Sequence, residues 1–167
     1  MSGRADGALQ GATGVLSSLT RPMIVATVIA DGALAGCLVG FHTQCSIDPA
    51  RYLVCVSRAN HTWRVVRRAD ALAVHFLAHD DMGLAHLFGE ATGDAVDKFA
   101  RCEWAPGPLG LPILSHHGSW LAGPIVSRHT AGDHHAIIID AVHGGSRPPG
   151  APLQSTEVLH FRPGHPA

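Results

Sequence analysis

The dipeptide Asp31-Gly32 stands between two apolar runs and constrains the fold more than any other feature of this sequence. Asp-Gly favours a two-residue turn with positive φ, and the twist of that turn suits two antiparallel strands. The run before it, Met23 to Ala30, is rich in β-branched residues, and the run after it extends from Ala33 to about Val39. We therefore predict a β-hairpin directly after the N-terminal segment.

Short β-rich runs and short helical segments follow the hairpin. Further strands are expected at residues 51–57, 71–78, 120–128 and 135–142, with a last edge strand at 158–161. A polar, irregular connection is expected at residues 40–49, and a Pro/Gly linker at residues 146–152. This order favours a mostly antiparallel barrel over a parallel βαβ sheet.

The expected helices are short. One is predicted over residues 61–69 with Asn60 as its N-cap, and another over residues 81–90 with Asp80 or Asp81 as its cap. Near the N-terminus, four apolar residues share one face of a short helix that Gly11 and Gly14 weaken and Pro22 ends: Leu9, Val15, Leu16 and Leu19.

The charge content excludes several classes of partner. Charged residues make up 15% of the 167 residues, the formal net charge is -1, and no basic run is present. Nucleic acid and anionic membrane surfaces are therefore not expected as main partners. No apolar stretch reaches the length of a membrane span, and the first residues lack an apolar signal core, so we expect a cytoplasmic protein. The low charge also favours association of subunits.

Four clusters contain candidate binding residues. The segment 36–49 begins with glycines that let backbone amides approach a ligand, and Ser57 to Thr62 forms a helix start that suits a phosphate. Asp97-Lys98-Phe99 places a cation beside an aromatic ring, and in Gly132 to His135 an aspartate precedes two histidines. Each cluster also has an ordinary interpretation: a strand connection, a capped helix, a solvated lysine or a polar turn.

Other chemistries lack their sequence signals. Neither a Walker loop nor G-x-G-x-x-G is present, and the nucleophile elbow G-x-S-x-G is missing. The 13 histidines include adjacent pairs at 116–117 and 134–135, which on a strand point to opposite faces, so no metal site is expected. The cysteines are interpreted as reduced thiols packed as small hydrophobes: Cys37, Cys45, Cys55 and Cys102.

Taken together, the clusters resemble the flavin reductase family with the FMN-binding split-barrel fold. The resemblance runs from about Thr20 to Val142 and depends on the order of its motifs more than on any single one. The matching segments are Ser46-Ile47-Asp48-Pro49, Ser57-Arg58-Ala59-Asn60-His61-Thr62, Ala73-Val74-His75-Phe76-Leu77, Asp97-Lys98-Phe99, Gly110-Leu111-Pro112 and Gly132-Asp133-His134.

The resemblance implies a mostly β fold, an antiparallel split β-barrel (Greek key) with short inserted helices. Residues 1–20 are then an N-terminal helix or arm, residues 21–145 the flavin-binding split barrel, and residues 146–167 a C-terminal linker and edge strand of the same domain. It further implies a homodimer whose two subunits both line the flavin groove. A flavin-dependent monooxygenase is the partner expected to receive reduced flavin.

The resemblance also implies the chemistry and the site residues. Hydride passes from C4 of NAD(P)H to N5 of FMN or FAD, and His134 is the candidate catalytic residue beside the nicotinamide. The loop around Gly36 to Ser46 is expected to hold the flavin ring, and Ser57, Asn60, Thr62 and Lys98 its phosphate. The full set of expected cofactor-binding residues is Gly36, Cys37, Gly40, Phe41, His42, Thr43, Cys45, Ser46, Asp48, Ser57, Arg58, Asn60, Thr62, Lys98 and Phe99.

Some positions depart from the family pattern. Ala50 replaces the second proline after Asp48-Pro49, Cys37 and Gly40 replace hydroxyl residues, and His75 replaces an asparagine. Three other interpretations stay open on the sequence: a deazaflavin-dependent or tightly FMN-bound oxidoreductase of the same fold, a flavin carrier without turnover, and a haem-binding module.

Overall fold

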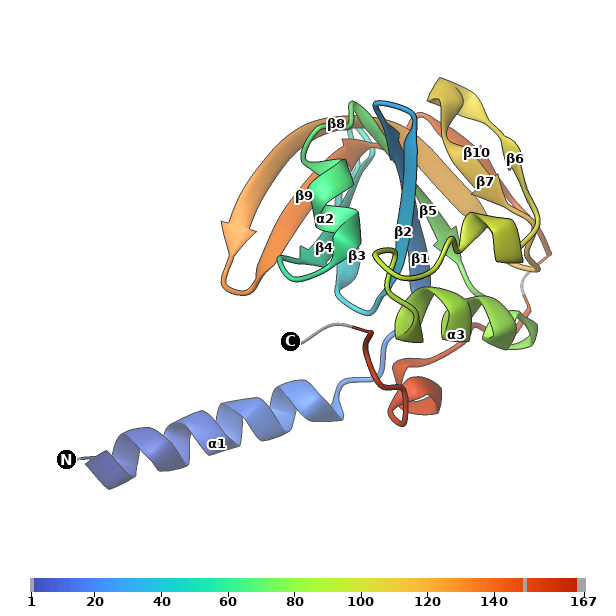
Figure 1. Cartoon of the computed structure of the whole chain (residues 1–167). Coiled ribbons are helices and arrows are strands. Elements are labelled where there is room, and N and C mark those ends of the chain that lie inside the picture. Colours follow the sequence, from blue (N-terminus) through green and yellow to red (C-terminus); the bar gives the residue numbers. More distant parts are fainter. Residues whose placement is uncertain (1, 149, 165–167) are drawn as a thin grey trace.

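The computed structural model describes residues 2–148 and 150–164 (Figure 1). Its strands form one curled antiparallel sheet in the order β2-β1-β5-β8-β9-β4-β3, with β10 paired to β8. A separate two-stranded ribbon consists of β6 and β7. The strands are β1 Ile24–Ala30, β2 Ala33–Val39, β3 His42–Ser46, β4 Arg51–Ser57, β5 Ala71–Phe76, β6 Trp104–Pro106, β7 Pro112–Leu114, β8 Trp120–Ala131, β9 His134–Asp140 and β10 His143–Gly145.

The long strand β8 joins the two halves of the sheet. Its first part pairs with β5 as far as Pro124, and its second part pairs with β9 from Ile125 onward. The register shifts between Ile125 and Ser127, and such a bulge bends a strand. The predicted mostly β class, with a curled antiparallel barrel and few short helices, is confirmed.

The predicted hairpin is confirmed, with Ala30 paired to Ala33. Asp31 and Gly32 adopt φ of 50° and 77°, the left-handed geometry that a two-residue turn of this kind requires. β1 is buried on both faces and is apolar except for Thr27, whose hydroxyl donates to the Pro112 carbonyl at 2.7 Å. Ile24 and Val28 belong to the main core, while Val25 belongs to a second core with Phe88 of the helix α3, Met82–Glu90.

Two helices pack on opposite faces of the β1–β2 hairpin, α2 in the main core and α3 in the second core. α2 is His61–Val66, and Asn60 is its N-cap as predicted, since the side-chain oxygen of Asn60 accepts the Thr62 N–H. It ends three residues earlier than expected, where the Arg128 guanidinium donates to the carbonyls of Val66 and Ala69.

α3 is Met82–Glu90, preceded by the short 3-10 turn His79–Asp81. Asp81 occupies the N-cap position without capping α3 by its side chain. Its carboxylate instead accepts the amides of Ala78 and His117 and the ring N–H of His117. The cap interaction expected here was therefore wrong, because a distant loop competes for the same oxygens.

Several other expectations are corrected. The segment expected to be irregular contains β3, which pairs with β4 over His42 to Ser46 and has a register shift near Gln44. The predicted edge strand at 158–161 is absent, and its first residue, Val158, ends a 3-10 turn, Ser155–Val158. Phe161 then turns back, with its N–H bonded to the Val158 carbonyl, and stacks on His86 of α3 at 4.2 Å.

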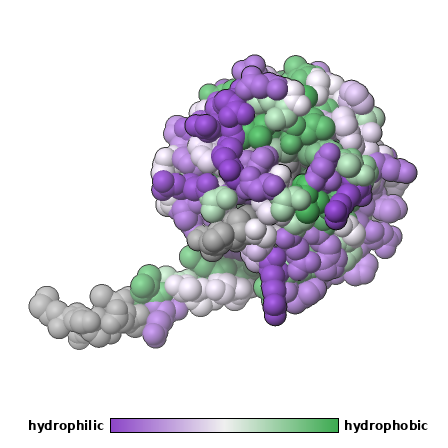
Figure 2. Space-filling view, viewed as in Figure 1, coloured by the Kyte–Doolittle hydropathy of each residue, from purple (hydrophilic) through white to green (hydrophobic). Residues whose placement is uncertain are grey.

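Other element boundaries move by a few residues, and the N-terminal helix is longer than expected. α1 is Ser2–Ser18 and extends away from the barrel (Figure 1), and the coloured atoms of its second half lie beside the rounded body in Figure 2. The apolar side chains of Leu9, Val15 and Leu16 on this arm are 67%, 63% and 60% exposed. In the described part of the chain, no helix combines the length and the apolar character needed to cross a bilayer.

Candidate functional site

Two cavities adjoin each other along β2. The first, which we call the lysine cavity, has a volume of about 470 Å³ and is lined by residues 93–99, His61 and the first part of β2 through Gly36. The second, which we call the histidine groove, has a volume of about 270 Å³. Its walls are residues 37–41, the end of β4, His134, α3 and the C-terminal segment with Phe161. Gly36 lines the first cavity and Cys37, the next residue of β2, lines the second.

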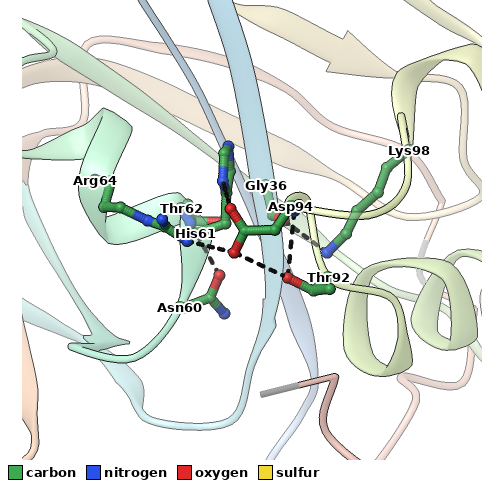
Figure 3. A network of polar contacts seen from close by, with 8 residues as sticks. All are labelled: Gly36, Asn60, His61, Thr62, Arg64, Thr92, Asp94 and Lys98. Carbon is green, nitrogen blue, oxygen red and sulfur yellow. Dashed lines mark hydrogen bonds and ion pairs between the residues drawn. The ribbon is translucent and has the colours of Figure 1, made fainter.

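Lys98 is the most unusual residue of the lysine cavity. It is 5% exposed, and its Nζ donates to the carbonyl oxygens of Gly36 at 3.1 Å and Phe88 at 3.3 Å (Figure 3 shows the first contact). Within residues 2–148 and 150–164, no carboxylate forms an ion pair with it. Burial lowers the pKa of this ammonium. A buried cation without a counter-charge is costly, and a bound anion offsets that cost.

The neighbours of Lys98 in sequence explain its position. Asp97 accepts the amides of Phe99 and Ala100 with one carboxylate oxygen, which starts a 3-10 turn over Phe99–Arg101. Phe99 is buried against the rings of Phe88 and Trp104. The motif thus has an aspartate that caps the turn and an aromatic ring that anchors it, and between them the lysine reaches β2.

Cys37 lies beside this lysine at the boundary of the two cavities. Burial raises the pKa of its thiol, against the opposing effects of a hydrogen bond with the Thr62 side chain and the charge of Lys98. Thr62 is itself buried. The predicted packing as a small hydrophobe is confirmed for Cys37, while Cys45 is exposed and Cys55 and Cys102 are half-buried.

A polar network that the sequence did not predict lies at the exposed side of the lysine cavity (Figure 3). His61 donates from Nδ1 to Asp94 at 2.9 Å, and the Arg64 guanidinium binds the other carboxylate oxygen. Thr92 donates to that second oxygen at 3.4 Å. The hydrogen bond from His61 is the main cause that lowers the pKa of Asp94. Residues 61 and 94 are far apart in sequence, and no local pattern connects them.

The helix start offers fewer free amides than expected. The Thr62 amide binds the Asn60 side chain, the Ala59 amide binds the Ser57 hydroxyl at 3.3 Å, and the Arg58 amide binds the Asp133 carbonyl at 3.0 Å. Ser57 and Asn60 line the histidine groove. Thr62 does not line it, but its side chain is hydrogen-bonded to Cys37, which does. The expected role of these residues at a phosphate stays a prediction.

His134 stands at the other end of the groove. Its Nδ1 donates to Asp133 at 2.7 Å, and its ring meets the Phe41 ring edge to face at 5.4 Å. His135 faces the other side of β9 and stacks on Trp63 at 3.5 Å. The prediction that these adjacent histidines point to opposite faces is confirmed. Only His134 lines the groove.

The β3 residues of the predicted set lie away from both cavities of their own chain. His42 donates from Nε2 to the Pro22 carbonyl at 2.9 Å, because that oxygen only accepts, and Nδ1 then accepts the Tyr52 hydroxyl at 2.6 Å. Burial raises the pKa of Tyr52 to about 12. The remaining members surround a shallow surface hollow or lie along the edge strand: Thr43, Cys45, Ser46 and Asp48. Their contact with a cofactor stays a prediction.

His75, which departs from the family pattern, has a structural role. It accepts the Leu114 amide at Nε2 and therefore donates from Nδ1 to the Val25 carbonyl. Burial lowers its pKa to about 3, so the imidazole is neutral and ties β5 to β1 and β7. Among the described residues, no three His, Cys, Asp or Glu side chains form a group that could hold a metal ion.

Comparison with known proteins identifies the family of this chain. The sequence matches the family described as flavin reductase like domain over residues 16–162. It is 28% identical over 120 residues to the reductase subunit HsaB of a flavin-dependent monooxygenase from Rhodococcus jostii, a match that spans 72% of this chain and 60% of that protein. It is also 27% identical over 135 residues to a flavin reductase from Pseudomonas putida, with 81% of this chain and 75% of the relative covered.

Solved structures share the fold. A flavin reductase domain protein from Arthrobacter superposes with a TM-score of 0.79 at 22% identity, covering 95% of this chain and 96% of that one. An NADH:FAD oxidoreductase from Streptomyces globisporus has a TM-score of 0.79 at 20% identity, covering 86% of this chain and 85% of the other. At this identity the likeness concerns the fold alone.

Proposed function

The chain belongs to the flavin reductase-like domain family, and from this premise we propose that it is an NAD(P)H:flavin oxidoreductase that transfers hydride to FMN or FAD. The observation that carries the proposal is Lys98, a buried ammonium unpaired with any carboxylate of the described residues. Lys98 lines the lysine cavity, and its ammonium donates to the carbonyls of Gly36 and of Phe88, which lines the histidine groove. An anionic ligand that extends over both cavities would supply the negative charge that this ammonium lacks.

The residues fit a flavin. The groove is lined by backbone of β2 and by the rings of Phe41, Phe88 and Phe161, which suit a flat aromatic ligand. At Gly36 an added Cβ would lie 2.8 Å from the Phe88 ring and 3.0 Å from the Ala26 carbonyl, so only glycine permits this packing. Lys98 would hold a phosphate at the junction of the cavities, as a charge-assisted donor.

When bound, the flavin supplies the chemistry by accepting hydride at its N5. The chain's own residues position and shield the reactants. Asp133 accepts the Nδ1–H of His134, so Nε2 of this groove residue is an acceptor, and we assign it the N–H of the nicotinamide carboxamide. The rings of Phe41 and Phe161 line the groove and exclude water from the reacting face. No general base is required, because a hydride transfer moves no separate proton.

A homodimer is part of the proposal. The exposed apolar residues of α1 need a cover, and the β3 residues predicted at the cofactor lie away from the cavities of their own chain. A second subunit would cover the apolar residues of α1 and would bring a flavin groove to the β3 residues. Light scattering at micromolar concentration with flavin present should report a dimer, and a monomer would contradict this part.

The proposal also includes a flavin-dependent monooxygenase as the recipient of reduced flavin. Support comes from the relatives, some of which are named as reductase subunits of such monooxygenases. We place the reaction in the cytoplasm, where NADH and NADPH are available.

Steady-state oxidation of NADH and of NADPH, with FMN, FAD and riboflavin as acceptors, tests the proposal. We expect NAD(P)H consumption that depends on added flavin. A chain that binds flavin and oxidises neither nucleotide would be a carrier or use another reductant, and a Soret band in the purified protein would indicate haem instead.

A further inference from the structure

The lysine cavity is larger than the flavin phosphate requires. Its volume of about 470 Å³ exceeds the 270 Å³ of the groove assigned to the flavin ring. Ligand pockets are usually about 300–1,000 Å³, so a volume of this size suits a group of nucleoside dimensions. A phosphate bound by Lys98 fills only the buried end of it.

The charges are arranged along the cavity from its buried end to its exposed side. Lys98 is 5% exposed, whereas the side chain of Asp94 is 48% exposed. The carboxylate of Asp97 also lines the cavity and is exposed. At the exposed side the Arg64 guanidinium pairs with Asp94, so that charge is largely balanced there. A lone cation inside and a balanced polar group outside suit a ligand that carries phosphate at one end and uncharged, hydroxyl-bearing groups at the other.

Specific contacts also hold the residues at the exposed side of the lysine cavity in place. Gly93 lets the loop approach His61, since a Cβ at that position would lie 2.7 Å from the His61 ring. This approach brings Asp94 to His61, Arg64 and Thr92, which hold its carboxylate in place. A carboxylate offers about four acceptor positions, so Asp94 keeps capacity for a ribose hydroxyl. The side chains of Leu34 and Val96 supply apolar wall for a base.

From this arrangement we infer that the lysine cavity is the subsite for the adenosine half of FAD, which makes the chain selective for FAD over FMN. The flavin is the source of the adenosine because the cavity continues from the phosphate position beside Lys98. This inference rests on the proposed function and extends it to the choice of flavin.

Equilibrium titration of the purified full-length chain with oxidised FAD, FMN and riboflavin tests the inference. The wild-type chain should bind FAD about tenfold or more tightly than FMN, since adenosine contacts of roughly 1.4 kcal/mol correspond to that factor. Ala95→Trp fills the cavity from an exposed position and should weaken FAD binding about tenfold while FMN binding changes less than about twofold. Ala100→Trp, an exposed alanine five positions on that does not line the cavity, is the matched control and should change neither.

Retained FMN binding in Ala95→Trp shows that the variant is folded. Equal wild-type affinities for FAD and FMN, or equal losses of both in Ala95→Trp, would overturn the inference. It is also overturned if the variant raises the KM for NADH and leaves FAD affinity intact, because the cavity then takes the adenosine of the reductant. Flavins that bind with the expected selectivity but are not reduced would refute the proposed function alone.

Discussion

The lysine cavity and the histidine groove share β2 but differ in how the chain builds them. Lys98 is 5% exposed and held by two backbone carbonyls, while the His134 side chain is 24% exposed and held by one exposed aspartate. A buried charge contributes strongly to the binding of an anion, and a partly exposed ring can adapt to a substrate that enters and leaves. From this difference we predict that the lysine end sets flavin affinity and that the histidine end sets the reaction with the reductant.

Removing the charge at the lysine end should have the largest effect. Lys98→Met should weaken FMN binding about 10- to 150-fold, because charge-assisted hydrogen bonds contribute roughly 1.5–3 kcal/mol and each 1.4 kcal/mol is a factor of ten. Riboflavin carries no phosphate, so its affinity should hardly change, as fluorescence titration would show. Arg101→Met removes an exposed cation of the same turn and serves as control. Equal losses for FMN and riboflavin would contradict the phosphate assignment.

At the histidine end, the effect should be on rate rather than affinity. His134→Ala should raise the KM for NAD(P)H or slow flavin reduction by about tenfold, with FMN affinity within about twofold. Stopped-flow reduction separates these quantities. His135→Ala is the matched control, because that ring stacks on Trp63 on the opposite face. Unchanged reduction of the His134 variant by both nucleotides would refute the role assigned to it.

The pH dependence of flavin affinity should show a smaller effect of the charge on Lys98. The pKa of Lys98 is lowered by burial, so as pH rises the ammonium loses its proton below the ordinary lysine value of about 10.4. The ratio of FMN affinity to riboflavin affinity should therefore fall with rising pH, several-fold at most. Taking the ratio removes effects on the flavin ring itself. A ratio that rises with pH, or that never falls over the whole pH range in which the protein stays folded, would show that Lys98 does not meet the phosphate.

Cysteine substitutions should have the smallest effect. Cys45 is exposed on β3 and Cys55 and Cys102 are half-buried, and burial raises the pKa of the latter two thiols. A thiol with a raised pKa is a poor nucleophile at neutral pH. Replacing each of the four cysteines with Ser or Ala should leave hydride transfer within a few-fold. Loss of turnover in a folded Cys45 variant would instead indicate a redox role near the flavin.

The sequence predicted the elements whose signals are local. The Asp31-Gly32 turn, the Asn60 cap and the opposite orientation of His134 and His135 all depend on neighbours within a few residues. Each follows from backbone geometry that tertiary contacts did not override. The resemblance of the ordered motifs to the flavin reductase family was confirmed by the family match over residues 16–162.

The errors occurred where distant partners decide the outcome. β3 looked irregular because its sequence is polar, yet β4 provides it with a ladder of hydrogen bonds. Phe161 was expected in an edge strand and instead stacks on His86, and Asp81 binds the 116–117 loop rather than capping α3. In each case a contact across the fold competes with the local preference.

By itself, the sequence determined the hairpin, the mostly antiparallel β class and the residue types at the candidate site. Only the tertiary structure decided that Lys98 is buried without a carboxylate partner in the described chain, and that His61 and Asp94 meet at the exposed side of its cavity. The physical reason is that burial and charge pairing depend on which surfaces the packed sheet brings together. Local sequence specifies a side chain's chemistry, but its desolvation and its partners are properties of the whole fold.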